Sequence, residues 1–231
     1  MRYVVKFFND LRFCFIMGSV ESNRSQSTSS EHVISSCGFN LKPAQLEAGI
    51  GSHQVWPCGT LLSQSILSDV VSVKGLRVVE LGCGLGIASL AAGQAGASSV
   101  SATDRDDLHA AVERNIQINR LNGTVRFHAL DWAEPESSGL RSNDFDIVIA
   151  ADVIYYEEQD PLLLALRWLL RGGNNFAVIA YRERSELDRD YLENVVLIEF
   201  ECFKRSTYDR EGEACELLWM RDAKTTLSQG A

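Results

Sequence analysis

The sequence has few of the residues that mark metal sites, and those it has are not grouped. Its six cysteines include no C-x-x-C pair, and none of its four histidines lies three to five residues from another histidine. Structural zinc sites need such spacings, so we expect no bound metal. We interpret the scattered cysteines as small buried residues of a protein from a reducing compartment.

Long apolar runs and an excess of positive charge are also missing. No apolar run reaches the roughly 18 residues of a membrane-spanning helix, and Asn9, Asp10 and Arg12 interrupt the N-terminal stretch that could otherwise be a secretory signal. Lys and Arg number 22 against 31 Asp and Glu, for a formal net charge of −9. Binding to nucleic acid or to an acidic membrane depends on cations, so we expect neither partner. We expect a monomer in the cytoplasm, or in cytoplasm and nucleus.

The composition divides the 231 residues into one domain and its tails. Residues 18–36 are rich in serine and almost lack large apolar residues, which is typical of disorder. We predict a disordered tail over residues 1–40, a folded domain over residues 41–222 and a short C-terminal tail over residues 223–231.

Short apolar or β-branched runs alternate with helical periodicity along the folded region. The expected strands are 77–81, 99–103, 124–130, 145–151, 176–181, 196–203 and 214–221. The expected helices are a segment from just after Pro57 to Val70, then 87–95, 104–120, 161–170 and 187–195. Strand–helix alternation followed by two late strands predicts an α/β fold, a doubly wound seven-stranded sheet whose last strand is antiparallel.

The most informative segment is Glu80 to Gly86 (ELGCGLG), at the end of the first expected strand. Glycines let a ligand approach the backbone, and the following helix offers unpaired N–H groups. A dinucleotide fingerprint would need its last glycine at Ile87. Glu80 is poorly placed for a pyrophosphate but well placed for an ammonium group, and Asp104 suits a ribose diol. A cationic ligand with a ribose and without phosphates is S-adenosylmethionine.

Further motifs follow the later strands, and with this turn the chain resembles the seven-β-strand, Rossmann-like methyltransferases, and among them methyltransferase family 16. The matching segments are Val55-Trp56-Pro57, Glu80 to Gly86, Asp104, Leu130-Asp131-Trp132, Ala151 to Glu158 and Tyr181 to Arg184. The resemblance spans roughly residues 41–221, and its last segment is similar to the chaperone-methylating branch. It implies an S-adenosylmethionine-dependent protein-lysine methyltransferase that acts on a protein such as a chaperone or a translation elongation factor.

The resemblance also implies roles for individual residues. Trp56 would contact the methionine end of the cofactor, and Asp131 and Trp132 its adenine. Asp152 and Tyr155 form a D-x-x-Y motif, in which Asp152 would orient the lysine amine and Tyr155 would wall its channel. The other residues expected to bind the cofactor are Glu80, Gly82, Cys83, Gly84, Gly86, Asp104 and Ala151.

Other interpretations stay open. Trp56 could be a packing residue and Asp152 a helix cap. Arg182 and Arg184 could be surface charges; otherwise one of them would orient a substrate or the Asp152 loop. The absence of proline between Asp152 and Tyr155 disfavours the amide and base nitrogens that Asn/Asp-Pro-Pro-Tyr/Phe enzymes methylate. The competing functions are a methyltransferase of protein histidine or of a small molecule, a nicotinamide-dependent oxidoreductase, and a non-catalytic binding module that keeps the fold.

Overall fold

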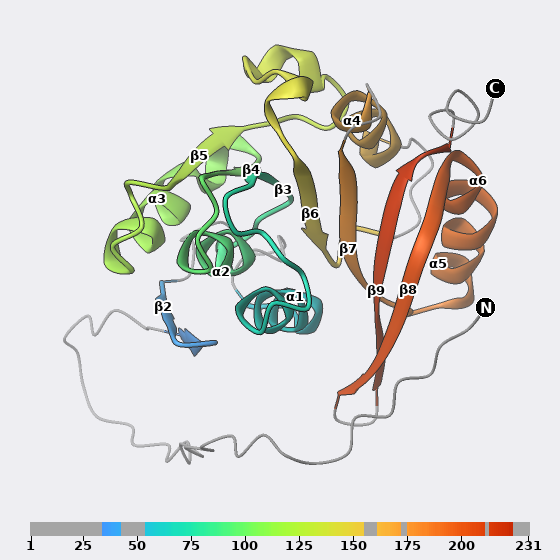
Figure 1. Ribbon diagram of the computed structural model, residues 1–231, viewed down its shortest axis with the longest axis horizontal. Helices are drawn as coiled ribbons and strands as arrows, with labels where there is room; N and C mark the ends of the chain where they lie inside the picture. The colour runs from blue at the N-terminus through green and yellow to red at the C-terminus, as the bar shows by residue number, and fades with distance from the viewer. Residues whose placement is uncertain (1–33, 43–53, 155–160, 172–174, 211–212, 224–231) are drawn as a thin grey trace.

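A computed structural model of the chain describes residues 34–42, 54–154, 161–171, 175–210 and 213–223 (Figure 1). Its main sheet has seven strands in the order β5-β4-β3-β6-β7-β9-β8. The strands are β3 (Arg77–Leu81), β4 (Ser99–Asp104), β5 (Val125–Ala129), β6 (Ile147–Ala151), β7 (Phe176–Arg182), β8 (Phe200–Arg210) and β9 (Glu213–Asp222). The pairs among β3 to β7 are parallel, whereas β9 is antiparallel to both of its neighbours. The predicted seven-stranded α/β fold is confirmed.

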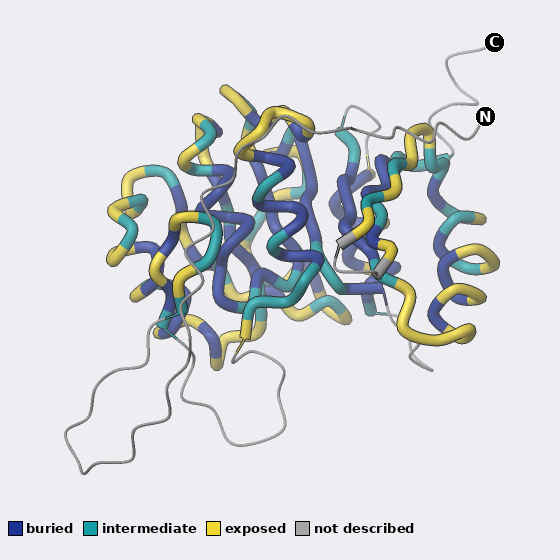
Figure 2. The backbone as a smooth tube through the Cα atoms, turned by 90° about the horizontal axis from the view of Figure 1, so that it is seen from below, coloured by how far each residue is buried: buried dark blue, intermediate teal, exposed yellow. Residues whose placement is uncertain are grey.

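Helices cover both faces of the sheet. One hydrophobic cluster contains buried residues of α1 (Pro57–Leu67), α2 (Ile87–Gln94) and α3 (His109–Ile118), and the other contains those of α4 (Pro161–Leu170) and of the segment after β7. That segment comprises α5 (Glu186–Tyr191), a π-helical turn (Leu192–Val196) and α6 (Leu197–Glu199). The backbone coloured by burial shows the buried core in the middle of the molecule and exposed residues along its outside (Figure 2). Because β6 is covered on both faces, its sequence is almost continuously apolar.

The order of the strands determines where a ligand can bind. From β3 the chain adds β4 and β5 on one side and then places β6 and β7 on the other side. In open α/β sheets, ligands bind beyond the carboxyl ends of the strands where the order reverses, which here is between β3 and β6. The segments that follow β3, β4, β5, β6 and β7 all meet at this edge.

The structure corrects the predicted N-terminal boundary. Residues 34–40 were expected to belong to the tail, but β1 (Ile34–Ser36) and β2 (Phe39–Leu41) form an antiparallel hairpin. Phe39 and Leu41 are 2% and 0% exposed and belong to the first hydrophobic cluster. Two apolar side chains anchor this hairpin, although the sequence around it is polar. The expectations for residues 1–33 and 224–231 lie outside the described residues.

Other boundaries also differ from the prediction: the helix expected at 104–120 is α3, at His109–Ile118, and two further differences have a clear physical reason. The first helix was expected to reach Val70 but ends at Leu67, because Asp69 adopts a left-handed backbone with φ 59°. The strand expected at 196–203 begins only at Phe200. Leu192, Val196 and Phe200 are buried at intervals of four, which is a helical spacing, so packing extends the helical segment through β-branched Val196. β8 then continues through polar residues to Arg210.

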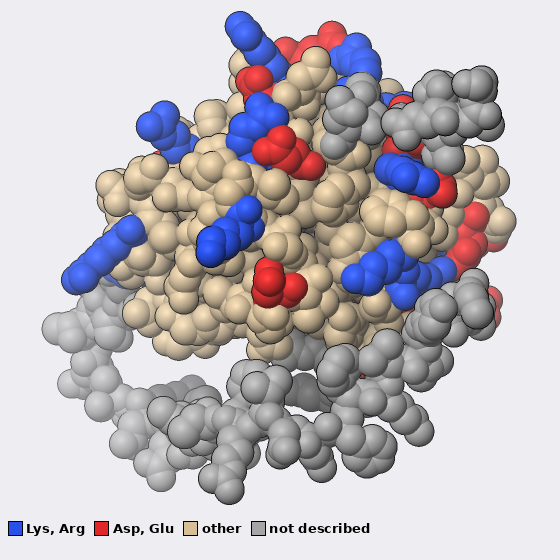
Figure 3. Space-filling view, viewed as in Figure 1, with Lys and Arg blue, Asp and Glu red and all other residues tan. Residues whose placement is uncertain are grey.

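The described surface gives two general observations. None of the helices in the described part of the chain is long and apolar enough to cross a membrane. On the face that Figure 3 shows, acidic and basic side chains are interspersed around larger uncharged areas.

The hairpin leads to the first testable prediction. A chain that begins at Pro43 should have a free energy of unfolding about 3 to 6 kcal/mol lower than a chain that begins at Ile34. This range corresponds to the burial of two large apolar side chains, Phe39 and Leu41, at about 1.5 to 3 kcal/mol each. Guanidinium-induced unfolding of the two proteins measures the difference. Equal unfolding midpoints and slopes would contradict the integration of the hairpin into the core.

Candidate functional site

A cavity of about 480 Å³ lies at the carboxyl edge of the parallel strands. Most of its described lining residues lie at the ends of five strands, β3 to β7, or just after them; Trp56 precedes α1 and Pro161 begins α4. They are Trp56, Gly82, Gly84, Asp104, Arg105, Leu130, Asp131, Trp132, Ala151, Asp152, Val153, Pro161 and Arg184. The cavity therefore lies at the position that the strand order predicts for a ligand, and its volume is within the range of small-molecule sites.

The glycine turn forms the floor of this cavity. Gly82, Gly84 and Gly86 all have left-handed backbones, with φ of 66°, 54° and 85°, which only glycine adopts without strain. A Cβ added at Gly84 would find no atom within 4 Å, so this residue faces open space. A Cβ at Gly82 would lie 3.0 Å from the indole of Trp132. Gly84 thus leaves room for a ligand, whereas Gly82 leaves room for Trp132.

Asp104 connects the end of β4 to this turn. Its Oδ2 accepts a hydrogen bond from the Gly84 N–H at 2.8 Å, and its Oδ1 accepts one from the Arg105 N–H at 2.8 Å. Burial raises the pKa of the carboxyl, and the two N–H groups oppose that shift. An ionised carboxylate can accept about four hydrogen bonds. The two N–H groups use two of these positions, so two are left for the hydroxyls of a ribose.

In the structure Glu80 contacts the start of α2, and its expected contact with an ammonium group stays a prediction. It is 2% exposed and is not among the described residues that line the cavity. Its Oε2 accepts hydrogen bonds from the Ser89 N–H at 2.8 Å and from Ser89 Oγ at 2.5 Å. The Gly86 N-cap of α2 makes no side-chain hydrogen bond, so Glu80 supplies the cap from the neighbouring strand. Burial raises the pKa of this carboxyl more than the hydrogen bonds from Ser89 lower it.

Asp152 directly follows β6 and, like Glu80 in the neighbouring strand β3, binds the start of a helix. Its backbone is left-handed, with φ 59°, a conformation that aspartate tolerates better than most residues. Oδ2 accepts a hydrogen bond from the Cys58 N–H at 3.1 Å, in the first turn of α1. Oδ1 lies 2.6 Å from Nη2 of Arg184, and the Asp152 side chain is only 4% exposed. Asp152 is thus a helix cap and a partner in an ion pair.

Arg184 connects Asp152 to an aromatic ring. Its guanidinium carbon lies 5.1 Å from the centroid of the Trp56 ring, within the range of a cation–π contact. Trp56 is the N-cap residue of α1 and is followed by Pro57 at the first helical position. Asp152 therefore holds this end of the cavity in two ways, through the first turn of α1 and through Arg184.

The opposite end of the cavity follows β5. Asp131 Oδ1 accepts a hydrogen bond from the Ala133 N–H at 2.9 Å, which orders the turn after the strand. Trp132 lies beside Gly82 and is half-buried. An exposed carboxylate next to a flat aromatic ring is suited to a heteroaromatic amine such as adenine.

The structure brings together most of the residues predicted from the sequence. Those that line the cavity are Trp56, Gly82, Gly84, Asp104, Asp131, Trp132, Ala151 and Asp152. Cys83 and Gly86 are not among its described lining residues. Cys83 is buried, and a Cβ at Gly86 would meet Val112 of α3 at 3.4 Å, so Gly86 serves helix packing. Tyr155 lies outside the described residues.

The prediction left out five lining residues: Arg105, Leu130, Val153, Pro161 and Arg184. Arg105, Leu130 and Val153 are direct neighbours of predicted residues, so their positions in the chain were a usable signal. Arg184 was considered as a surface charge or as a residue that would orient a substrate or the Asp152 loop, and the structure shows it paired with Asp152, 32 residues away in the chain.

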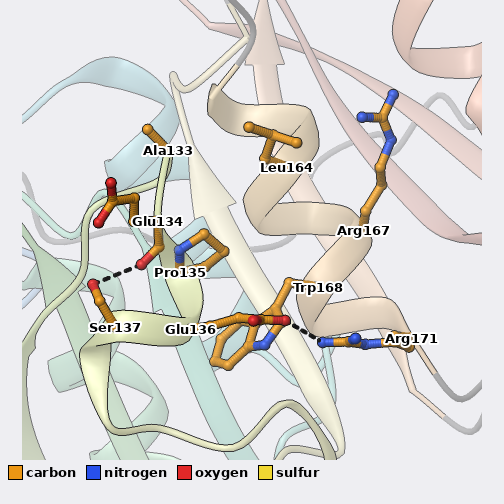
Figure 4. Close-up of a pocket in the computed structure, with 9 residues that line it drawn as sticks. All are labelled: Ala133, Glu134, Pro135, Glu136, Ser137, Leu164, Arg167, Trp168 and Arg171. Carbon is orange, nitrogen blue, oxygen red and sulfur yellow. Dashed lines mark hydrogen bonds and ion pairs between the residues drawn. The ribbon is translucent and has the colours of Figure 1, made fainter.

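A second cavity, of about 590 Å³, lies between α4 and the segment after Trp132 (Figure 4). Pro135, Leu164 and Trp168 give it an apolar part, and an ion pair joins Arg171 to Glu136 across it. It contains none of the predicted site residues and no glycine turn. The cavity at the strand ends is therefore the better candidate for a functional site.

The residues of that cavity suit S-adenosylmethionine. Gly84 leaves space above the backbone, Asp104 has acceptor capacity for a ribose, and Asp131 with Trp132 offers a polar and aromatic site for adenine. Arg105 and Arg184 are the cations in the lining, and Arg184 is paired with Asp152.

Comparison with known proteins places these features in a family. The family model described as lysine methyltransferase matches residues 38–197. Protein N-lysine methyltransferase METTL21A of Danio rerio is 32% identical over 142 residues, which are 60% of this chain and 64% of the relative. Protein-lysine N-methyltransferase EFM6 of Saccharomyces cerevisiae is 32% identical, over 64% of this chain and 70% of the relative. EEF1A lysine methyltransferase 3 of Mus musculus is 29% identical, over 65% of each chain. The matches thus span about two thirds of these relatives' lengths.

Solved structures share the fold at low sequence identity. The ribosomal protein L11 methylase of Lactobacillus delbrueckii subsp. bulgaricus has a TM-score of 0.52 at 21% identity, over 83% of this chain and 99% of the other. Magnesium protoporphyrin IX methyltransferase of Synechocystis PCC 6803, solved with bound S-adenosylmethionine, has a TM-score of 0.52 at 19% identity, over 75% and 87%. Both show a methyltransferase fold.

The open space above Gly84 leads to a test of ligand binding. We expect Gly84→Val to weaken S-adenosylmethionine binding at least tenfold in titration calorimetry, because its side chain would occupy the space that the ligand needs. Gly75→Val is the matched control. Gly75 also has a left-handed backbone and open space, with φ 76°, but precedes β3 at the opposite edge. Both variants bear a similar strain of about 1 to 2 kcal/mol. Equal affinity in the two variants would mean that Gly84 faces no ligand.

The burial of Glu80 leads to a prediction about pH. Burial raises the pKa of its carboxyl from 4.5 to about 8 despite the hydrogen bonds from Ser89. The folded protein then holds a proton that the unfolded chain loses, so this contribution to stability falls as the pH rises from about 4.5 to 8. Glu80→Gln cannot titrate. We therefore expect the stability of this variant relative to wild type to increase between pH 5.5 and 9 in denaturant unfolding; a constant difference would contradict the shifted pKa.

Proposed function

Because the chain belongs to the lysine methyltransferase family whose model matches residues 38–197, we propose that it transfers a methyl group from S-adenosylmethionine to a lysine of another protein. The observation that carries this proposal is the buried Asp152 carboxylate at the end of a cavity that suits the cofactor. Two relatives are named protein-lysine methyltransferases, which supports a protein lysine as the substrate.

The lining residues divide the cavity between the parts of the cofactor. Asp131 and Trp132 would hold adenine, Asp104 the ribose, and the backbone at Gly84 would lie against the ligand. Trp56, on the other side of the turn, would contact the methionine end. When bound, S-adenosylmethionine supplies a methyl group on a positively charged sulfur, which an amine can displace.

The end of the cavity at Asp152, here called the acceptor end, must bind a lysine side chain that is a cation in water. A lysine amine has a pKa of about 10.4 and is almost fully protonated at neutral pH, so it has to lose a proton before it can act as a nucleophile. A low-dielectric environment lowers the pKa of an amine, and a nearby carboxylate can orient it and accept its hydrogen bond. Asp152 is the carboxylate at this end, and we assign it the role of orienting the lysine amine and accepting its proton. We assign Tyr155, from the same D-x-x-Y motif, to the wall of the lysine channel.

The substrate is proposed only as a class. A chaperone or a translation elongation factor fits the similarity of the Tyr181 to Arg184 segment to the chaperone-methylating branch and the name of the mouse relative, which refers to EEF1A. Incubation of the recombinant protein with cofactor labelled in the methyl group and a cell extract tests the proposal. Mass spectrometry should find the label on lysine. Label on histidine or on a small molecule would support the other methyltransferases, and binding without transfer would support a non-catalytic module.

The role of Asp152 can be tested with a variant that keeps its shape. We expect Asp152→Asn to lower methyl transfer by about 100- to 10,000-fold, the range for loss of a positioned proton acceptor. The affinity for S-adenosylmethionine should change less than tenfold, since Asp104 and Gly84 are intact. Asp146→Asn is the control: Asp146 also joins a backbone N–H and an arginine, those of Arg77, but precedes β6 at the other edge.

Arg184→Ala separates two ways in which Asp152 could act. If Asp152 contacts the lysine directly, removing the arginine should leave maximal transfer within tenfold and lower the KM for the protein substrate, because a competing cation is gone. If Asp152 acts only by holding Arg184 over Trp56, then Arg184→Ala should reproduce the defect of Asp152→Asn. The second result would contradict the orienting role.

A further inference from the structure

A buried asparagine outside the cavity is joined to the back of the glycine turn. Asn115 lies on α3 and is 0% exposed. Its Nδ2 donates a hydrogen bond to the Leu85 carbonyl at 3.1 Å, and Leu85 lies within the turn, between Gly84 and Gly86. Asn115 therefore binds the turn without being among the described residues that line the cavity.

The same amide also holds the N-terminal hairpin. Oδ1 of Asn115 accepts a hydrogen bond from the Lys42 N–H at 2.8 Å, and its Nδ2 also donates to the Lys42 carbonyl at 3.2 Å. Lys42 directly follows β2, whose Leu41 is fully buried. One side chain thus satisfies backbone groups of two segments that are more than 40 residues apart in the chain.

A second asparagine, the C-cap residue of α3, binds the hairpin but not the turn within the described part of the chain. Asn119 lies one helical turn after Asn115; its Oδ1 accepts from the Asn40 N–H at 3.1 Å and its Nδ2 donates to the Asn40 carbonyl at 2.8 Å. Asn40 and Lys42 are alternate residues, so their backbone groups point to the same edge of the hairpin. The two asparagines take the place of a neighbouring strand. Of the two, only Asn115 has a hydrogen bond to the glycine turn in the described structure.

Loss of the Asn115 amide would affect the turn as well as the hairpin. The Leu85 carbonyl would lose this buried partner, and a buried acceptor without a hydrogen bond is destabilising. The turn could recover part of this cost only by moving. Its position on the cavity side depends on the Gly84 N–H bond to Asp104, so a movement there would also displace Asp104 from the ribose position.

We propose that Asn115 is a positioning residue for the cofactor: it fixes the glycine turn against the β1–β2 hairpin and so sets the backbone on which S-adenosylmethionine binds. This inference rests on the proposed function. It also means that residues 34–42, which the sequence assigned mostly to a tail, support the cofactor site.

The test compares Asn115→Ala with Asn119→Ala in the full chain. Titration calorimetry with S-adenosylmethionine should give a dissociation constant at least tenfold higher for Asn115→Ala and within twofold of wild type for Asn119→Ala. Both variants lose hydrogen bonds to the hairpin, so both should melt at lower temperature. At saturating cofactor, methyl transfer by Asn115→Ala should stay within threefold of wild type, because the acceptor end is unchanged.

Asn115→Asp provides a second test if the alanine variant does not fold. Aspartate has nearly the same shape and keeps the acceptor for the Lys42 N–H, but an ionised carboxylate cannot donate to Leu85. It should also bind the cofactor at least tenfold more weakly. Binding within twofold of wild type in a folded Asn115 variant, or equal weakening in Asn119→Ala, would overturn the positioning role alone. A wild-type protein that does not bind S-adenosylmethionine would overturn the proposed function and this inference with it.

Discussion

The site depends on two carboxylates that cap helices from a distance. The N-cap residues of α1 and α2, Trp56 and Gly86, make no side-chain hydrogen bonds to their own helices. The first N–H groups of a helix have no hydrogen-bond partners within the helix, and burying them unpaired is destabilising. Glu80 satisfies the Ser89 N–H and Asp152 satisfies the Cys58 N–H, and both carboxylates lie at or just after the carboxyl ends of neighbouring strands. The two caps fix both helices to the edge of the sheet where the cavity lies.

Much of this site could be predicted because its signals are local. A glycine in a tight turn, or an aspartate directly after a strand, acts within a few residues of its own position. Gly84 and Asp104 were assigned correctly to one place because the ends of parallel strands meet there. The contact of Glu80 with Ser89 could not be predicted in the same way. Its position two residues before Gly82 indicates a residue of the turn, and only the packed structure shows that it also binds the start of α2.

Contacts between distant segments could not be predicted from local pattern. Asp152 and Cys58 are 94 residues apart, and Asn115 and Lys42 are 73 residues apart. The hairpin was missed because it has only two large buried residues, Phe39 and Leu41, in a polar region. In the late segment, β-branched Val196 favours a strand on propensity, yet it packs at a helical interval from Leu192. In each case tertiary packing overrode a weak local preference.

The two ends of the cavity differ in how they are held, and this bears on the chemistry. The floor consists of backbone in conformations that glycine fixes, and Asp104 and Asn115 bind it through uncharged N–H and C=O groups. The acceptor end is held by charge: Asp152 joins the dipole of α1 to the guanidinium of Arg184, which in turn lies against Trp56. A second cation that approached Asp152 would compete with Arg184 for Oδ1 while the Cys58 N–H kept Oδ2 in place. The carboxylate could then change partners without losing its position, and the role proposed for Asp152, which is to receive and release a lysine, requires such an exchange.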